Sequence, residues 1–240
     1  MCLFKSAIAI QDETHKDGFR LLSSPFTESH SDLIALHKLK DNARLTFARV
    51  EFYPNDGKDL ASPEKYKLHI DEERTPEWFT FEKQDRCAEI MRVWIKAMII
   101  EGEAELLVGG PYILAKGAKI SCIKNCLITA MLGSSNVGVM LESSNVGVML
   151  GSSNVGVMWG SSKVGVMRES SNVGVMWGSS NVGEMWGSSK VGEMRESSNV
   201  GVMRGSSKVG VMWGSSNVGV MLESSKAPND KKPDHDYRNT

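Results

Sequence analysis

The chain has 240 residues, and its 28 lysine and arginine residues nearly balance 29 aspartate and glutamate residues, for a formal net charge of −1. A chain so close to neutral lacks the basic excess with which dedicated nucleic-acid binders displace counterions from phosphates, so we expect no nucleic-acid partner. The apolar runs at residues 7–10 and 97–100 are too short for a signal-peptide core or a membrane span. We therefore expect a soluble, cytoplasmic protein, with export by an unconventional route as the open alternative.

The cysteines are few, and no two of them form a Cys-x-x-Cys pair: Cys2, Cys87, Cys122 and Cys126. A disulfide framework in a small secreted domain is usually denser than this, so we expect reduced thiols.

The N-terminal part of the chain has the mixed composition of an ordinary domain. Residues 3–10 are rich in apolar residues and are predicted to pair as a strand with Phe19–Leu22 across a polar turn. Ser29 or Ser31 is expected to cap a short helix that runs to Leu39 and carries Leu33, Leu36 and His37 on one side.

The next elements complete the predicted N-terminal domain. Residues 45–53 alternate as in a half-buried strand, whose buried face is expected to be Thr46, Ala48, Val50 and Phe52. Tyr66–Ile70 is a further strand candidate. A helix is predicted from Glu82 to Ile100, after a capping Thr80, because apolar side chains recur at three- and four-residue spacing: Cys87, Ile90, Met91, Trp94, Ile95, Met98 and Ile99. Packed on the sheet, this helix would give an α+β domain over residues 1–110.

From Ser134 to Glu223 the sequence is a nine-residue unit repeated ten times. The unit reads Ser-Ser-(Asn/Lys)-Val-Gly-(Val/Glu)-Met-x-(Gly/Glu), where x is Leu, Trp or Arg; residues 125–133 and 118–123 look like degenerate copies, the latter one residue out of phase. Two glycines in most units would cost a helix roughly 1 kcal/mol each relative to alanine, which favours short β-segments. One unit cannot bury an apolar face alone, so we predict a β-solenoid over residues 111–225.

Differences between the copies separate the interior of the solenoid from its surface. Positions one, two, four, five and seven of the unit never vary, whereas the other four positions vary and most accept charged residues. Because an unpaired buried charge is strongly destabilising, the variable positions are expected to be exposed. We predict that the second serine, the valine and the methionine point inward, and that the invariant glycine at position five serves a bend.

The number of residues in one turn follows from charge spacing. The glutamates at position nine recur every 27 residues, and a 27-residue turn would stack them: Glu142, Glu169, Glu196 and Glu223. Like charges on adjacent strands repel, so we predict an 18-residue turn and treat 27 as a unit of duplication. Roughly six such turns from Gly117 to Glu223 would extend about 30 Å at β-sheet spacing.

An 18-residue turn also predicts which side chains meet along the solenoid. It places Arg195 between Trp177 and Trp213, where cation–π contacts can form. It likewise sets Trp186 between Arg168 and Arg204. Two unfavourable lysine contacts remain, between Lys190 and Lys208 and between Lys208 and Lys226.

In Ser135-Asn136-Val137 and Met140 the unit resembles the short-repeat β-solenoid proteins of bacteria and their phages, including those with Gly-Asn-Ala-x-Val-type tandem repeats. The N-terminal segments 29–34, 47–52 and 76–79 look like an uncharacterised domain that precedes such repeats. This resemblance implies the architecture and no activity.

Four tryptophans at position eight are the best candidates for a contact surface: Trp159, Trp177, Trp186 and Trp213. Large exposed aromatics often mark a binding site for a protein, a sugar chain or another copy of the chain. The alternative is that they stack along the solenoid and shield the edges of its turns.

Candidate catalytic and metal-binding groups are sparse. Cys2 could be an N-terminal nucleophile if Met1 is removed, but no other element of that chemistry is recognisable. Metal sites need several converging ligands, and His15, His30, His37 and His69 show no ligand spacing, although His69 and Asp71 share one side of a strand. Cys126 is expected to point inward and Cys122 outward, and Glu184 and Glu193 to lie on opposite faces, too far apart for paired acid–base catalysis. We expect no catalytic site, metal or cofactor.

The sequence therefore predicts a non-catalytic structural or interaction protein whose solenoid self-associates or displays a binding surface, with a protein or carbohydrate partner. The alternative is a small enzyme or ligand-sensing domain in the N-terminal part, with the repeat as a spacer. The polar segment 226–240, with Pro228 and Pro233, is predicted to be disordered and to blunt the open edge of the last turn.

Overall fold

The computed structural model describes residues 5–24, 27–40, 46–56, 59–72 and 74–229. The chain divides into two compact units, Met1–Met98 and Ile99–Thr240. The boundary expected at residue 110 falls inside a strand of the second unit. Residues 230–240 of the predicted disordered tail lie outside the described residues, as do Cys2 and Leu3. No helix among the described residues is both long and apolar enough to cross a membrane.

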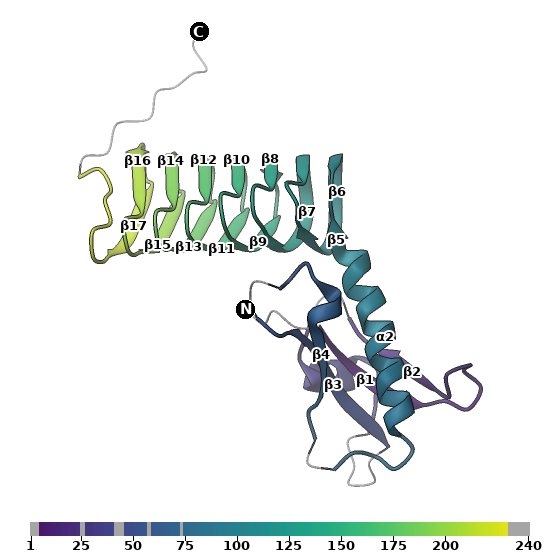
Figure 1. Ribbon diagram of the computed structural model, residues 1–240. Helices are drawn as coiled ribbons and strands as arrows, with labels where there is room; N and C mark the ends of the chain where they lie inside the picture. The colour runs from purple at the N-terminus through teal and green to yellow at the C-terminus, as the bar shows by residue number, and fades with distance from the viewer. Residues whose placement is uncertain (1–4, 25–26, 41–45, 57–58, 73, 230–240) are drawn as a thin grey trace. The chain divides into compact units, whose positions relative to one another are not determined.

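The first unit contains a four-stranded antiparallel sheet in the order β2-β1-β3-β4 (Figure 1). Its strands are β1 (Lys5–Gln11), β2 (Phe19–Leu22), β3 (Phe47–Pro54) and β4 (Tyr66–Ile70). The predicted pairing of the first two strands is confirmed, with Gln11 opposite Phe19 beside the turn.

In the described part of this unit, two α-helices and a 3₁₀ turn accompany the sheet: α1 (His30–Leu36), η1 (Pro63–Lys65) and α2 (Phe81–Met98). Ser29 is the N-cap of α1, where its Oγ accepts a hydrogen bond from the Asp32 N–H at 3.2 Å. Leu33 is buried as expected, but Leu36 is exposed. Helix α2 ends at Met98, two residues before the predicted end, because Ile99 and Ile100 form a strand of the second unit.

The apolar faces of α2 and β3 were predicted incompletely. On α2 the buried residues are Cys87, Ala88, Met91 and Ile95, a narrower stripe than expected. On β3 the predicted Ala48, Val50 and Phe52 are fully buried, but Thr46 is exposed and Phe47 is buried on the other face. Phe47 is buried because Leu33 of α1 packs with it and with Ile8, so both faces of this sheet are covered.

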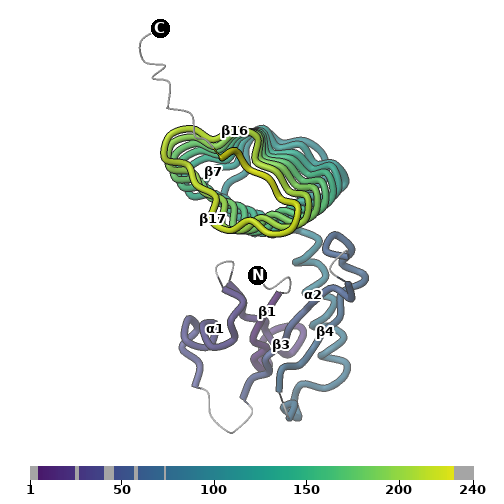
Figure 2. Tube along the Cα trace, turned by 90° about the vertical axis from the view of Figure 1, so that its left-hand side faces the viewer, coloured from purple at the N-terminus to yellow at the C-terminus, as the bar shows by residue number. Residues whose placement is uncertain are grey.

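The second unit is a β-solenoid of parallel strands, viewed from the side in Figure 1 and along its axis in Figure 2. Strands β5 (Ile99–Ile100) and β6 (Glu103–Leu114) precede β7 (Lys119–Met131), which pairs with both β8 and β9 and so begins two ladders. The first ladder continues through β8 (Asn136–Leu141), β10 (Asn154–Met158), β12 (Asn172–Met176), β14 (Lys190–Met194) and β16 (Lys208–Met212). The second continues through β9 (Asn145–Met149), β11 (Lys163–Met167), β13 (Asn181–Met185), β15 (Asn199–Met203) and β17 (Asn217–Met221).

The register confirms an 18-residue turn. Val155 pairs with Val137 on one side and Val173 on the other, and the same spacing holds along both ladders. The predicted lysine contacts are present, since Lys208 pairs with Lys190 and forms an isolated bridge with Lys226. The pairing of β7 with β8 is one residue shorter, Ile120 opposite Val137, which matches the phase shift in the sequence. The solenoid starts earlier than expected, because β5 and β6 add a further turn.

The interior of the solenoid has the predicted composition. The second serine of all ten units is fully buried, and so are the valine and the methionine of the first nine, to within 5% exposure. Ser135 and Ser144 donate hydrogen bonds from Oγ to the carbonyl three residues earlier, each at 2.7 Å. Burying a valine and a methionine in each unit removes apolar surface from water that one unit could not bury alone.

The invariant glycine at position five does not form the bend, contrary to our prediction. It lies within a strand, and in nine of the ten units a Cβ atom placed there would come within 2.5–2.6 Å of a backbone carbonyl oxygen in the preceding turn. The bend falls instead at position nine, where Gly187 has φ 67° and Glu169 has φ 57°. Position five is therefore fixed by the close approach of successive turns, and position nine by a left-handed backbone conformation.

Replacing a position-five glycine is expected to separate two turns. In Gly183→Ala the new methyl group would lie 2.5 Å from the Gly165 carbonyl oxygen. We expect the free energy of unfolding to fall by about 1–3 kcal/mol, the usual cost of overpacking. Chemical denaturation followed by circular dichroism measures this. The control is Asn181→Ser in the same strand, which should be nearly neutral; equal effects of the two changes would refute the close-contact explanation.

Candidate functional site

One column of position-eight side chains follows the first ladder. Trp159 and Trp177 stack in parallel, with ring centroids 5.0 Å apart and an interplanar angle of 3°. The guanidinium carbon of Arg195 lies 4.5 Å from the Trp177 ring centroid and 5.8 Å from that of Trp213. The column is thus a stack of three indoles interrupted by one guanidinium, as the 18-residue turn predicts.

A second position-eight column follows the other ladder and contains Trp186. The guanidinium carbon of Arg204 lies 4.7 Å from the Trp186 ring centroid. Trp186 also donates a hydrogen bond from Nε1 to Glu184 Oε2 at 2.7 Å. Arg195, in the first column, forms the matching contact with Glu193 at 2.7 Å. Both glutamates therefore hold the position-eight side chain of their own unit.

These contacts change how the four tryptophans are interpreted. Trp159 is 43% exposed, whereas Trp177, Trp186 and Trp213 are half-buried. Stacking and cation–π contacts within the chain give the indoles a structural role that needs no external partner. The two columns also belong to different ladders, so the four tryptophans do not form one strip.

The C-terminal turn of the solenoid differs from the turns inside it. Strand β17 is at the end of its ladder, and among the described residues its one strand partner is β15. Val220 is 49% exposed and Met221 is 44% exposed, although methionines at this position are buried in the preceding units. On the other ladder Lys226 covers part of the edge of β16, where its carbonyl accepts a hydrogen bond from the Val209 N–H at 2.9 Å.

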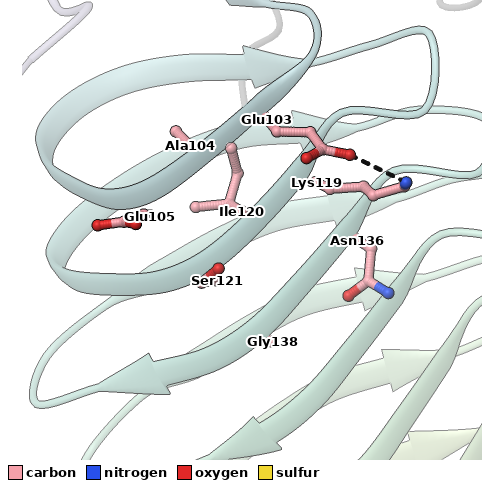
Figure 3. Close-up of a pocket in the computed structure, with 8 residues that line it drawn as sticks. All are labelled: Glu103, Ala104, Glu105, Lys119, Ile120, Ser121, Asn136 and Gly138. Carbon is pink, nitrogen blue, oxygen red and sulfur yellow. Dashed lines mark hydrogen bonds and ion pairs between the residues drawn. The ribbon is translucent and has the colours of Figure 1, made fainter.

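A shallow hollow of about 540 Å³ lies at the opposite end of the first ladder (Figure 3). Its lining residues come from β6, β7 and β8: Glu103, Ala104, Glu105, Lys119, Ile120, Ser121, Asn136 and Gly138. Lys119 and Glu103 form an ion pair of 3.0 Å across the strands. Both partners are largely exposed, so the pair is weak, and the hollow contains no group that points to a particular chemistry.

The candidate catalytic groups of the solenoid do not converge. Glu184 is on β13 and Glu193 is on β14, in different ladders, as predicted. Cys126 points inward, and burial raises the pKa of its thiol to about 11. In the first unit burial raises the pKa of Cys87 to about 12. Thiols with such pKa values are poor nucleophiles, because the thiolate is the reactive form.

The first unit brings together three potential ligands that the sequence did not predict to meet. Single donor atoms of His30, Glu51 and Asp71 all lie within 4.8 Å of one another. They come from the start of α1, the middle of β3 and the residue after β4. His69 pairs with Glu51 in the register of β3 and β4, but it is exposed, its ring lies 6.1 Å from that of Tyr53, and it is not one of the three ligands. In the sequence, the one sign of this convergence is that Glu51 lies in β3 and Asp71 directly follows β4, the strand that pairs with β3.

A buried ion pair lies close to this group. Glu28 accepts hydrogen bonds from Lys5 Nζ at 2.8 Å and from the Ser6 N–H at 2.6 Å. Burial raises the pKa of Glu28, while the contact with Lys5 opposes that rise. Both carboxylate oxygens of Glu28 therefore already accept hydrogen bonds from other residues.

No protein-family profile matches the chain, and comparisons with curated proteins and with solved structures find no match.

The buried thiols are expected to resist alkylation in the folded protein. With pKa values of about 12 for Cys87 and about 11 for Cys126, both remain protonated at neutral pH. Iodoacetamide at pH 8, followed by peptide mass spectrometry, should label the partly exposed Cys122 much faster than either of them. Denaturant should equalise the rates. Fast labelling of Cys87 in the native state would contradict the buried environment.

The Arg195 stack is expected to contribute to stability. Arg195→Ala removes contacts with Trp177, Trp213 and Glu193, and we expect the free energy of unfolding to fall by about 1 kcal/mol. Arg195→Lys keeps the charge but loses the planar stacking group, so it should restore less than half of the loss. Urea denaturation followed by tryptophan fluorescence measures both. If Arg195→Ala leaves the free energy of unfolding unchanged, the stack does not contribute to stability.

Proposed function

We propose that the chain is a non-catalytic interaction protein whose solenoid self-associates through its C-terminal turn. The observation that carries this proposal is the outer side of β17, which no strand in the described part of the chain covers and where the normally interior Met221 becomes exposed. An unpaired strand edge offers N–H and C=O groups to another chain, and exposed apolar side chains add a hydrophobic driving force.

The exposed surface can be compared with the turn before it. Met203, one turn earlier on β15, is completely buried, whereas Met221 is 44% exposed. Val220 and Leu222 beside it are also exposed, at 49% and 40%. Pairing with a second copy would restore to Met221 the environment that every other repeat methionine has.

A two-fold arrangement suits this edge. Two β17 strands related by a two-fold axis would pair antiparallel, each edge meeting the same edge of its partner. Lys226 already covers part of the neighbouring edge of β16, so pairing would be confined to one side of the turn. Longer assemblies would need a second, different surface.

The tryptophan columns are a second proposed contact surface. Trp159, the most exposed of the four, could stack against a sugar ring or an aromatic side chain of a protein partner. We further propose a cytoplasmic setting, a chain without nucleic-acid partners, and kinship with the nonapeptide solenoids of bacteria and phages. The repeat composition and the near-neutral charge support these proposals.

The test of self-association is the mass of the full chain in solution. Light scattering after size exclusion, at rising protein concentration, should show a dimer. Met221→Glu should shift the equilibrium strongly towards monomer, because it places charge on the apolar edge. The control is Val148→Glu, at the position of the repeat that carries Glu184 natively, and it should leave the dimer unchanged.

Two results would refute the proposed interface. The chain could be monomeric at every concentration, or a dimer could persist in Met221→Glu and dissociate in Trp159→Ala. The second result would move the contact to the tryptophan column.

A further inference from the structure

We infer that the first unit binds one divalent cation of the zinc or manganese class between His30, Glu51 and Asp71. The three donor atoms lie within 4.8 Å of one another. Donors to Zn²⁺ lie about 2.0–2.2 Å from the metal, so any two are at most about 4.4 Å apart. A small side-chain adjustment would therefore bring all three donors into coordinating distance.

The hydrogen bonds of His30 indicate that a positive charge belongs between it and Asp71. The ring is 9% exposed, and its Nε2 lies 3.2 Å from the Val50 carbonyl oxygen, an acceptor that requires a proton on Nε2. Nδ1 lies 3.2 Å from Asp71 Oδ2, also an acceptor. Two acceptors facing each other repel unless Nδ1 carries a second proton or both atoms bind a cation.

The contact with Val50 is the arrangement that a metal-binding histidine needs. Histidine ligands usually donate their other ring N–H to a carbonyl or carboxylate, which fixes the tautomer and orients the ring. Here that contact leaves Nδ1 free to face Asp71 Oδ2, at 3.2 Å. Asp71 is 55% exposed, so an ion could enter from solvent.

Charge and backbone contacts around the group also favour a cation. Among the described residues, neither Glu51 nor Asp71 forms an ion pair with a lysine or an arginine. The backbone N–H of Asp71 donates to the Arg49 carbonyl at 3.0 Å, which holds this residue at the end of β4. Zn²⁺ or Mn²⁺ would neutralise the two carboxylates that face this imidazole.

An unpartnered hydroxyl lies on the same face of the sheet. Ser6 pairs directly with Glu51 across β1 and β3, so their side chains leave the sheet on one side. Ser6 Oγ is buried and has no hydrogen-bond partner among the described residues. A water molecule bound to the metal would give it one, since three protein ligands leave a coordination position open.

The ligand set selects among cations. Imidazole favours Zn²⁺ and other first-row ions, whereas Mg²⁺ and Ca²⁺ prefer sites made only of oxygen. We therefore expect Zn²⁺ to bind best, Mn²⁺ more weakly, and Mg²⁺ least.

The test is calorimetric titration of the chelator-treated full chain with ZnCl₂, MnCl₂ and MgCl₂. One equivalent of Zn²⁺ should bind. Glu51→Gln and Asp71→Asn should each weaken binding on the order of 10-fold or more, since even loss of an outer partner of a ligand costs that much. Both changes preserve side-chain size, and circular dichroism checks that the variants fold.

The control is His15→Gln, because His15 also faces a carboxylate, Asp17, at 3.7 Å but without a third ligand. It should leave Zn²⁺ binding unchanged. A second readout is the ¹⁵N chemical shift of the His30 ring, where Nδ1 should change on adding Zn²⁺ while Nε2 stays protonated. The proposal is overturned if Zn²⁺ does not bind, if Glu51→Gln and Asp71→Asn bind it normally, if His15→Gln weakens it equally, or if His30 keeps a proton on both nitrogens with Zn²⁺ present.

Discussion

Backbone contact between successive turns is the constraint on which the solenoid depends. Position five of the unit lies so close to the preceding turn that only glycine fits, and the parallel ladders keep that distance constant. Because the turns stack in register, each valine lies on a valine and each methionine on a methionine. The uniform interior, the positions of the bends and the two outer columns all follow from this one spacing.

The outer columns show how a rigid stack can vary its surface. Positions six and eight point away from the interior, and the chain uses them for coupled changes: Glu184 accompanies Trp186, and Glu193 accompanies Arg195. Position nine accepts glutamate in a left-handed conformation that disfavours side chains, as at Glu142 with φ 58°. At this position Glu142 forms a surface ion pair with Lys124 at 2.9 Å. Variation is thus confined to groups that do not disturb the stacking.

The repeat was predictable because its copies act as internal comparisons. Invariance marked the buried serine, valine and methionine, and charge repulsion selected the 18-residue turn. Invariance could not say why position five is glycine, since a bend and a close contact demand the same residue. The N-terminal unit, which has no internal copies, was less predictable: alternation in β3 indicated one buried face, whereas Phe47 on the other face is also buried because α1 packs there, and that packing leaves no periodic signal. His30 and Asp71 are separated by 41 residues, and only the folded sheet brings them within 3.2 Å.

The pairing of every unit with the second unit along the chain has a consequence for insertions and deletions. Gain or loss of one nine-residue unit would leave the interior unaltered, because any unit can stack on any other. It would, however, move every later unit from one ladder to the other. The indole of Trp213, for example, would then lie on the opposite face of the solenoid. Gain or loss of two units would restore the original sides. In such a chain the parity of the copy number, more than its size, determines which groups share a surface.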